Sequence, residues 1–185
     1  MSIQHWHELG PFTIFDVETT GFSPTQHKII EIAAVRVELD GTENYFSSLI
    51  NPSCTIPYRI TQITKISNTM VADKPIFADV GNAFCDFARG TTLIAHNAKF
   101  DLAFLQESLA RTGLQPWKGK TLDSLSLTKQ TFNNLPSYKL QDLKLLLGLE
   151  YDCENNAHRA LDDAKLTVAL VRKVFTSLLE RENKF

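Results

Sequence analysis

The sequence predicts one α/β domain with a central mixed β-sheet flanked by helices. Three strand-like segments come first, and Asp40-Gly41 is a hairpin signal between the second and third. Short apolar strands and helical patterns then alternate. Antiparallel strands followed by mixed elements are typical of an α/β or α+β sheet and differ from a pure Rossmann repeat. The 185 residues suffice for a single domain, with the motif-bearing core expected over about residues 12–179.

The first strand is predicted over residues 12–17, which are mostly apolar. Residues 28–39, KIIEIAAVRVEL, predict a second strand because they are rich in Ile and Val. The third strand is expected over residues 42–50, after the hairpin turn. A short helix near residues 60–66 is expected in the polar, proline-containing segment that follows.

The second half of the chain predicts helices separated by short strands. A helix is expected over 75–88, with its proline in the first turn. Residues 92–95 predict a short buried strand, and Asn97 is expected to cap a helix that reaches about Arg111.

Three further elements complete the predicted domain. Residues 121–125 predict a short strand that runs into a helix. Ser137 is expected to cap a helix through Leu147, closed by a glycine. The last helix is expected over about residues 157–179.

Composition and charge exclude several classes of protein. No apolar run approaches the length of a membrane span, so no membrane association is expected. The three cysteines are scattered, which argues against a disulfide framework or a cysteine-rich zinc site and favours a reducing, cytoplasmic location. The net charge of -2 argues against a protein that coats long DNA. It is compatible with an enzyme that holds a few terminal nucleotides.

The stretch FTIFDVETTGF places Asp16 and Glu18 at the end of an apolar strand. Alternate strand residues share a face, so the two carboxylates lie side by side and repel unless a cation or a proton lies between them. A second D-x-E, at residues 152–154, lies in a polar segment where its acids are simply solvated. The motif alone leaves two interpretations equal: a cation site, or a strand end that reaches solvent.

The stretch LIAHNAKFDLAFL carries a short strand into a helix with Asp101 in its first turn. An acid there is common because the helix dipole favours it. The loop after a strand is nevertheless where α/β sheets keep their sites, and His96 and Asn97 lie on it. Asn97 is interpreted first as a cap and second as a site residue.

The stretch NAHRALDDAKLTVALV offers adjacent acids, which helical geometry separates. With Ala160 at 0° and about 100° per residue, the apolar face covers roughly 20–80°. Asp162 falls at about 200°, which predicts solvation, and Asp163 falls at about -60°, at the border of the apolar face. His158 is expected to precede the regular helix, on a segment able to swing over the site.

Two other acids carry less weight. Glu31, inside IIEIAAV, shares a strand face with apolar residues and is expected to be partly buried, but it has no companion acid along the sequence. Asp123, in TLDSL, is expected to support the site or to cap a helix.

The segments DVETTG, HNAKFD and HRALDD, in this order, resemble the three motifs of the DEDDh exonucleases, the DnaQ-like branch of the ribonuclease H-like superfamily. The resemblance covers roughly residues 12–175. Within this family, the sequence is similar to the epsilon and PolC-type proofreading domains of DNA polymerase III. The patterns D-x-E, N-x-x-F-D and H-x-A-x-x-D fall on Asp16, Glu18, Asn97, Phe100, Asp101, His158, Ala160 and Asp163. SYKLQDLKLLLGLE also resembles the family segment before the last motif.

The resemblance implies a ribonuclease H-like fold and a 3′–5′ exonuclease that releases nucleoside 5′-monophosphates. It implies two divalent cations, Mg²⁺ or Mn²⁺, which hard carboxylate ligands suit. Asp16 is expected to be the shared ligand, with Glu18, Asp101 and Asp163 completing the coordination. The resemblance assigns His158 as the general base that accepts a proton from the attacking water.

Contacts with the terminal nucleotide are expected after Glu18, where Thr19, Thr20 and Gly21 offer backbone donors and a small residue. Phe22 and Phe100 are expected either to stack on terminal bases or to pack in the core, and both interpretations stay open. Single strands or frayed ends are the expected substrates.

One segment departs from the family pattern. ITKISN resembles a loop that helps to hold the 3′ end, but Lys65 stands where the family often has glycine. Thr64 and Ile66 are expected near the substrate, but the departure at Lys65 leaves the details of their contacts undecided.

Two alternatives remain beside the DNA exonuclease. One is an exoribonuclease like RNase T or oligoribonuclease, because selection against the 2′-hydroxyl depends on pocket shape. The other is a non-catalytic module of the same fold that binds nucleic acid or a polymerase. The expected partners are nucleic-acid 3′ ends, DNA before RNA, and a replicative DNA polymerase.

Overall fold

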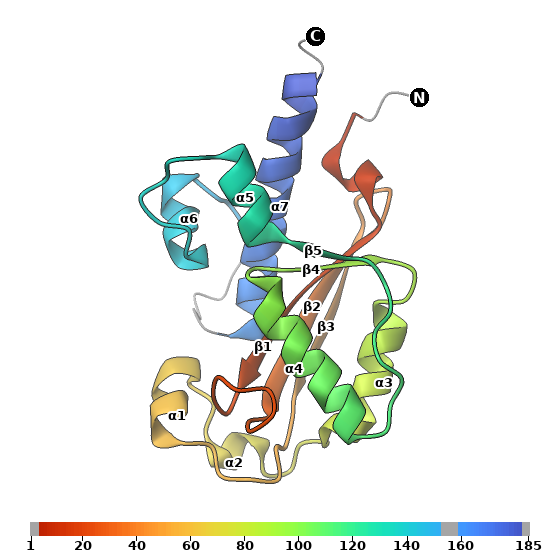
Figure 1. Ribbon diagram of the computed structural model, residues 1–185, viewed down its shortest axis with the longest axis vertical. Helices are drawn as coiled ribbons and strands as arrows, with labels where there is room; N and C mark the ends of the chain where they lie inside the picture. The colour runs from red at the N-terminus through yellow and green to blue at the C-terminus, as the bar shows by residue number, and fades with distance from the viewer. Residues whose placement is uncertain (1–3, 153–158, 183–185) are drawn as a thin grey trace.

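The computed structural model describes residues 4–152 and 159–182. A five-stranded mixed sheet in this part of the chain has the order β3-β2-β1-β4-β5 (Figure 1). The strands are β1 (Phe12–Thr19), β2 (Ile29–Val37), β3 (Glu43–Leu49), β4 (Thr92–Ala95) and β5 (Thr121–Asp123). The first three pair antiparallel, whereas β4 and β5 continue the sheet in parallel from β1. The predicted mixed sheet and all five strands are confirmed, and β1 lies at its centre.

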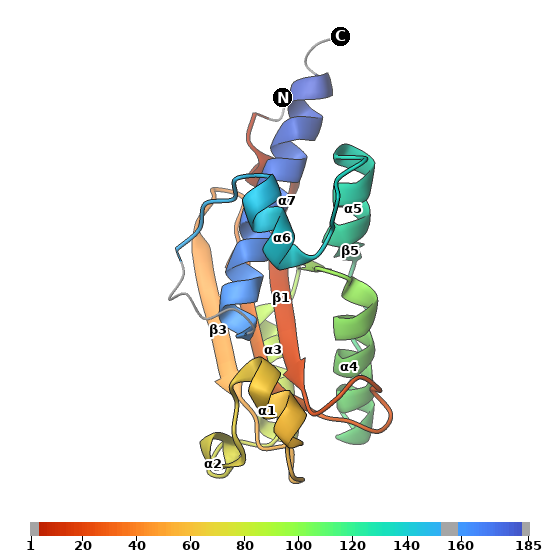
Figure 2. The same cartoon turned by 90° about the vertical axis from the view of Figure 1, so that its left-hand side faces the viewer.

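Helices cover both faces of the sheet (Figures 1 and 2). α7 (Ala160–Glu182) packs on one face, where Phe12 and Ile14 of β1 point. α3 (Phe77–Phe87) and α4 (Ala98–Arg111) pack on the other face. Because side chains alternate along a strand, Asp16 and Glu18 share the α7 face with Phe12 and Ile14.

The shorter helices lie around this sandwich. α1 (Tyr58–Thr64) lies near the carboxyl end of β1, followed by α2 (Asn68–Val71) (Figure 2). α5 (Ser124–Thr131) and α6 (Leu140–Leu146) pack beside α7. A short 3₁₀ turn (Trp6–Leu9) precedes β1. No helix within the described ranges is both long and apolar enough to cross a membrane.

Two predicted helix starts are wrong. α6 begins at Leu140 rather than near Ser137, whose hydroxyl donates instead to Asp142 Oδ2 at 2.6 Å. α3 begins at Phe77, because the chain at Ile76 is still extended. Sequence patterns place such ends poorly because the cap is decided by local geometry.

Asn97 occupies the predicted N-cap position of α4, but its side chain makes no capping hydrogen bond within the described structure. Its φ of 66° is left-handed. The N–H groups of Asn97 and Ala98 donate to Asp123 Oδ1 at 3.0 and 3.1 Å instead. The same carboxylate accepts from Leu125 N–H and from the Ser126 hydroxyl at the start of α5. Asp123 therefore holds two helix starts together, as one of its predicted roles allowed.

The predicted solvation of Asp162 is wrong: its exposed fraction is 7%. The helical wheel assumed a single buried face. α7 packs on the sheet and also beside α5 and α6, so its buried surface extends further around the helix. Leu166, about 40° from Asp162 around the helix axis, is fully buried for the same reason.

We predict that Asp123→Ala lowers the free energy of unfolding by about 1–2 kcal/mol, because it removes acceptors from two helix starts. Partial burial acts to raise the pKa of Asp123, but hydrogen bonds from Ser126 and Ala98 outweigh it and hold the pKa below its usual value. The stabilisation is therefore present above pH about 4 and is lost as the pH falls through the lowered pKa. Urea denaturation at pH 7 and pH 3 measures both effects.

The matched control is Asp73→Ala, at an exposed acid. It should change the free energy of unfolding by less than about 0.5 kcal/mol. Equal losses in the two variants would contradict the capping role of Asp123.

Candidate active site

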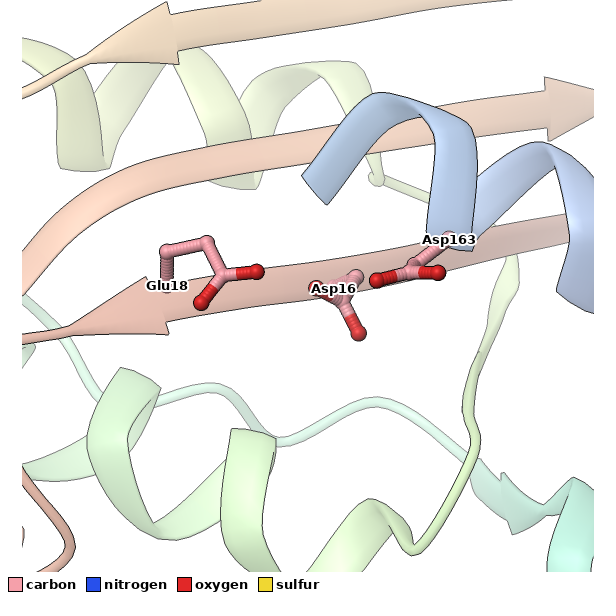
Figure 3. Close-up of side chains that lie close together, drawn as sticks. All are labelled: Asp16, Glu18 and Asp163. Atoms are coloured by element: carbon pink, nitrogen blue, oxygen red, sulfur yellow. The ribbon is translucent and has the colours of Figure 1, made fainter. Parts of the chain in front are cut away.

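Three carboxylates meet at the carboxyl end of β1. Asp16 and Glu18 come from the strand and Asp163 from the first turn of α7, and one oxygen of each lies within 4.8 Å of the others (Figure 3). The strand presents both of its acids because residues 16 and 18 share a face. The β1–β2 register shifts directly after Glu18, where the regular pairing ends. The structure thus brings together three of the four predicted metal ligands.

Burial and mutual repulsion disfavour the charged forms of these acids. Burial, followed by Asp101 and Glu18, raises the pKa of Asp16 well above its usual value. Burial, followed by the charge of Asp163, raises the pKa of Glu18 to about 8. A divalent cation reverses both effects, because it compensates for the lost hydration and the repulsion together. Carboxylate oxygens are the ligands that hard divalent cations prefer, so this cluster is a fitting cation site.

Asp101 lies next to this cluster but outside the group of three described above. It belongs to the first turn of α4, has an exposed fraction of 3%, and accepts a hydrogen bond from Val17 N–H at 3.2 Å. Burial raises the pKa of Asp101 to about 8, although the Val17 hydrogen bond acts against this rise. The charge of Asp101 in turn raises the pKa of Asp16, which places the two carboxylates within electrostatic reach.

The predicted general base, His158, lies outside the described residues. α7 begins at Ala160, two positions later.

Gln141 contacts the site and was not predicted from the sequence. Its side-chain amide on α6 donates to Asp163 Oδ1 at 2.6 Å. The only sequence signal was the family resemblance of the segment that contains it. The contact restrains the Asp163 carboxylate from a second helix, α6.

A cavity of about 710 Å³ opens beside the carboxylates. Its lining includes Asp16, Asn97, Tyr138, Lys139, Gln141 and Asp163. The cavity lies between the start of α4 and the segment that leads into α6, so its walls depend on how that segment is held.

His96 holds one wall of this cavity. Its Nε2 lies 2.9 Å from the Tyr138 carbonyl oxygen, which can only accept, so Nε2 carries the proton and donates. The Ser124 hydroxyl then donates to Nδ1 at 3.0 Å. Burial lowers the pKa of His96, which keeps the ring neutral. His96 therefore ties the loop after β4 to the segment before α6.

The loop after Glu18, which is predicted to contact the nucleotide, is held by hydrogen bonds of its own side chains. The Thr19 hydroxyl donates to the Gly21 carbonyl at 2.6 Å, and the Thr20 hydroxyl accepts a backbone N–H from across the loop. A Cβ at Gly21 would lie 2.3 Å from the ring of His27, so only glycine fits there. Phe22 projects from the loop with 69% of its surface exposed. The Phe22 ring is therefore not packed in the core, which agrees with the stacking interpretation rather than the core-packing one.

The other predicted contacts differ in their exposure. Phe100 is partly buried and packs against Phe104 at a centroid distance of 4.8 Å, which favours its core-packing interpretation. Thr64 and Ile66 are buried, with exposed fractions of 2% and 0%, so their side chains are not accessible to a ligand. Asn97 is exposed at the cavity.

Glu31 has partners that the sequence did not indicate. It lies directly opposite Glu18 in the β1–β2 register, and its exposed fraction is 2%. Its carboxylate forms an ion pair with Arg159, with a shortest distance of 2.7 Å. Glu31 thus has both a companion acid across the strands and a cation from the start of α7.

The mixed sheet and the acidic cluster at the end of its central strand define a ribonuclease H-like enzyme with a divalent-cation site. Comparison with known proteins agrees: a family model described as Exonuclease, RNase_T, matches residues 13–171. The chain belongs to this exonuclease family. The DnaQ-like resemblance is confirmed, and the enzyme class is that of the 3′–5′ exonucleases.

Two relatives and one solved structure illustrate the family. DNA polymerase III subunit epsilon of Treponema pallidum is 38% identical over 180 residues, which are 96% of this chain and 80% of that protein. The 3′-5′ exonuclease DinG of Bacillus subtilis is 38% identical over 92% of this chain, which spans only 18% of that protein. Exonuclease X in complex with 5′ overhanging duplex DNA is 30% identical with a TM-score of 0.73, covering 90% of this chain and 92% of that one.

We predict that Glu18→Gln stabilises the metal-free protein at pH 8 by about 1–3 kcal/mol, because it removes a carboxylate that folding forces to take up a proton. Glu18 is ionised in the unfolded chain above about pH 4.5 but protonated in the metal-free fold up to about pH 8. Metal-free stability therefore falls as the pH rises through this window, and the variant falls less steeply.

Urea denaturation in a chelator at pH 4 and pH 8 measures the effect. Wild type and variant should converge at pH 4, where Glu18 is neutral in both states. The control is Glu180→Gln, at an exposed acid of α7, which should show no such difference. A Glu18→Gln protein less stable than wild type at pH 8 would contradict the repulsion.

Proposed function

We propose that this protein removes nucleotides one at a time from the 3′ end of DNA and releases nucleoside 5′-monophosphates. The observation that carries this proposal is the convergence of Asp16, Glu18 and Asp163 within 4.8 Å beside a large cavity. Two divalent cations, Mg²⁺ or Mn²⁺, suit an all-carboxylate site with so much unbalanced negative charge. Such ions, when bound, lower the pKa of water and neutralise charge on the scissile phosphate.

The protein groups take distinct roles in this proposal. Asp16, at the centre of the cluster, is the shared ligand, with Glu18 and Asp163 on either side. Asp101 completes the set from α4, held to β1 through the Val17 N–H. His158 accepts the proton of the attacking water, a role that rests on the third motif.

The terminal nucleotide is proposed to lie against the loop after β1. The His27 ring packs closely on Gly21 and holds this loop, and the exposed Phe22 ring offers a sequence-tolerant stacking surface. The backbone near Thr64 and Ile66 is proposed to border the same nucleotide, with Asn97 on the cavity side. A duplex end must fray to reach such a site, so single-stranded ends are the preferred substrate.

A proofreading role beside a replicative DNA polymerase is the physiological setting that we propose. The supporting observation is the 38% identity to an epsilon subunit over 80% of that protein. A cytoplasmic location accords with that role. DNA is favoured over RNA because the 30% identical exonuclease X was solved with duplex DNA. The competing hypothesis is an exoribonuclease with the same catalytic residues. The assay below distinguishes the two hypotheses by comparing DNA with RNA.

We predict that the purified protein with Mg²⁺ shortens a 5′-labelled single-stranded DNA oligonucleotide one nucleotide at a time. Asp16→Asn should lower the rate by at least about 10³-fold, because it removes the shared ligand, whereas Glu180→Gln should retain full activity. Gel separation of the products, with matched RNA run in parallel, measures both. Intact oligonucleotides of both kinds would contradict the enzyme, and preferential loss of RNA would favour the exoribonuclease.

We predict that His158→Ala lowers kcat by about 10²–10⁴-fold, because it removes the proposed proton acceptor. Mn²⁺ affinity, measured by calorimetry, should stay within about twofold because no metal ligand changes. An unchanged kcat would remove His158 from the mechanism. His27→Ala is unsuitable as a control because the His27 ring packs on the Gly21 loop, so His5→Ala serves instead.

A further inference from the structure

Glu31 is a buried acid on β2 that the proposed chemistry does not use. It lies opposite Glu18 across the antiparallel β1–β2 pair, so the two carboxylates share the face that α7 covers. A buried carboxylate next to a second one is costly unless it is paired. The partners of Glu31 therefore indicate why it is there.

Both oxygens of Glu31 are occupied by the residues that begin α7. Arg159 approaches through Nε, at 3.2 and 3.1 Å from the two oxygens, and through Nη2 at 2.7 Å from Oε1. The N–H of Ala160 donates to Oε2 at 3.0 Å. Glu31 thus supplies, from β2, an acceptor for an N–H that the first turn of a helix leaves unsatisfied.

The position fixed by Glu31 is one helical turn from Asp163. The Asp163 N–H donates to the Arg159 carbonyl at 3.0 Å, so the turn that carries the acid starts at the anchored residue. The chain of contacts is therefore continuous from Glu31 through Arg159 to Asp163. A turn released at Arg159 is free to fray, because its first N–H groups have no partner within the helix.

Arg159 also acts on the charge balance at the site. It pairs with Glu31, which lies directly opposite Glu18 across the two strands. Its guanidinium is held bidentately by Glu31, a geometry that a lysine ammonium does not reproduce. The pair therefore places one cation on the acid that neighbours Glu18 across the sheet.

We propose that Glu31 and Arg159 are positioning residues of the active site: the pair fixes the first turn of α7 so that Asp163 meets Asp16 and Glu18 in a geometry ready for metal. The pair rests on the proposed function, because it acts on the same cation site. Loss of this pair is expected to change the metal affinity of the folded protein, whereas loss of a purely stabilising ion pair changes only the free energy of unfolding. A loosened Asp163 weakens metal binding, whereas lost stability alone leaves the affinity of the folded protein unchanged.

Glu31→Gln and Arg159→Lys test the inference, and calorimetric titration of the metal-free protein with Mn²⁺ is the primary readout. Each variant should bind Mn²⁺ about 10–100-fold more weakly, as expected when a partner that orients a ligand is lost. Its kcat should fall with little change in KM for the oligonucleotide, and high Mn²⁺ should restore part of kcat. Arg159→Lys keeps the charge, so it reports on geometry even if Glu31→Gln folds poorly.

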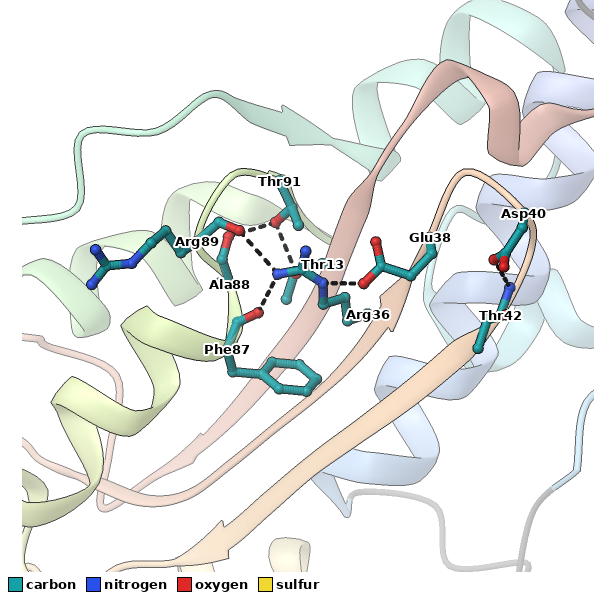
Figure 4. A network of polar contacts seen from close by, with 9 residues as sticks. All are labelled: Thr13, Arg36, Glu38, Asp40, Thr42, Phe87, Ala88, Arg89 and Thr91. Carbon is teal, nitrogen blue, oxygen red and sulfur yellow. Dashed lines mark hydrogen bonds and ion pairs between the residues drawn. The ribbon is translucent and has the colours of Figure 1, made fainter.

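The Arg36–Glu38 pair provides the matched control (Figure 4). Arg36 Nε lies 2.6 Å from Glu38 Oε1, and the same guanidinium donates to the carbonyls of Phe87 and Arg89. Glu38→Gln alters a more exposed ion pair of the same residue types, beyond the end of β2 away from the acids, and should leave Mn²⁺ affinity unchanged.

The outcomes separate the inference from the function that it rests on. Folded Glu31→Gln and Arg159→Lys proteins with wild-type Mn²⁺ affinity would overturn the positioning role. Equal weakening in Glu38→Gln would overturn it too, because any ion pair would then have the effect. A wild-type protein that takes up no metal would instead overturn the proposed function.

Discussion

Mutual repulsion among buried carboxylates at the end of β1 is the constraint on which the other features of this protein depend. Asp16, Glu18 and Asp163 lie within 4.8 Å of one another, with Asp101 and Glu31 close enough to raise the pKa of Glu18 further. A fold optimised only for stability has no reason to gather these acids. A divalent cation gives one, because it converts the repulsion into coordination.

The scaffold is arranged to hold this unfavourable cluster in place. The sheet supplies two acids through strand alternation, and α7 brings the third across its face. Gln141 holds Asp163 from α6, and the Val17 N–H holds Asp101 at the edge of the cluster. Asp163 and Asp101 are thus each restrained by a contact from another element, as preorganised metal sites require.

Sequence predicted the elements and the convergence of three carboxylates better than it predicted the residues that support them. Strand alternation and helix periodicity are local, so they predict β1 and favour Asp163 over its neighbour. The pairing of Glu31 with Arg159 joins residues 128 positions apart, and no periodicity records such a contact. The burial of Asp162 was missed because helices on a second side of α7 are a tertiary feature that a single-face wheel omits. At the start of α4 the side-chain cap expected from Asn97 is replaced by the carboxylate of a distant residue, Asp123.

Anomalous diffraction from crystals grown with Mn²⁺ tests the central claim most directly, because it locates the ions without reference to activity. The account predicts two anomalous peaks about 3.5–4 Å apart between the carboxylates of Asp16, Glu18 and Asp163. Crystals of the Asp16→Asn protein should lose at least one peak. Anomalous peaks from Mn²⁺ bound at other places on the molecule, with no peak among these three side chains, would contradict the proposal that cations balance the charge of the cluster.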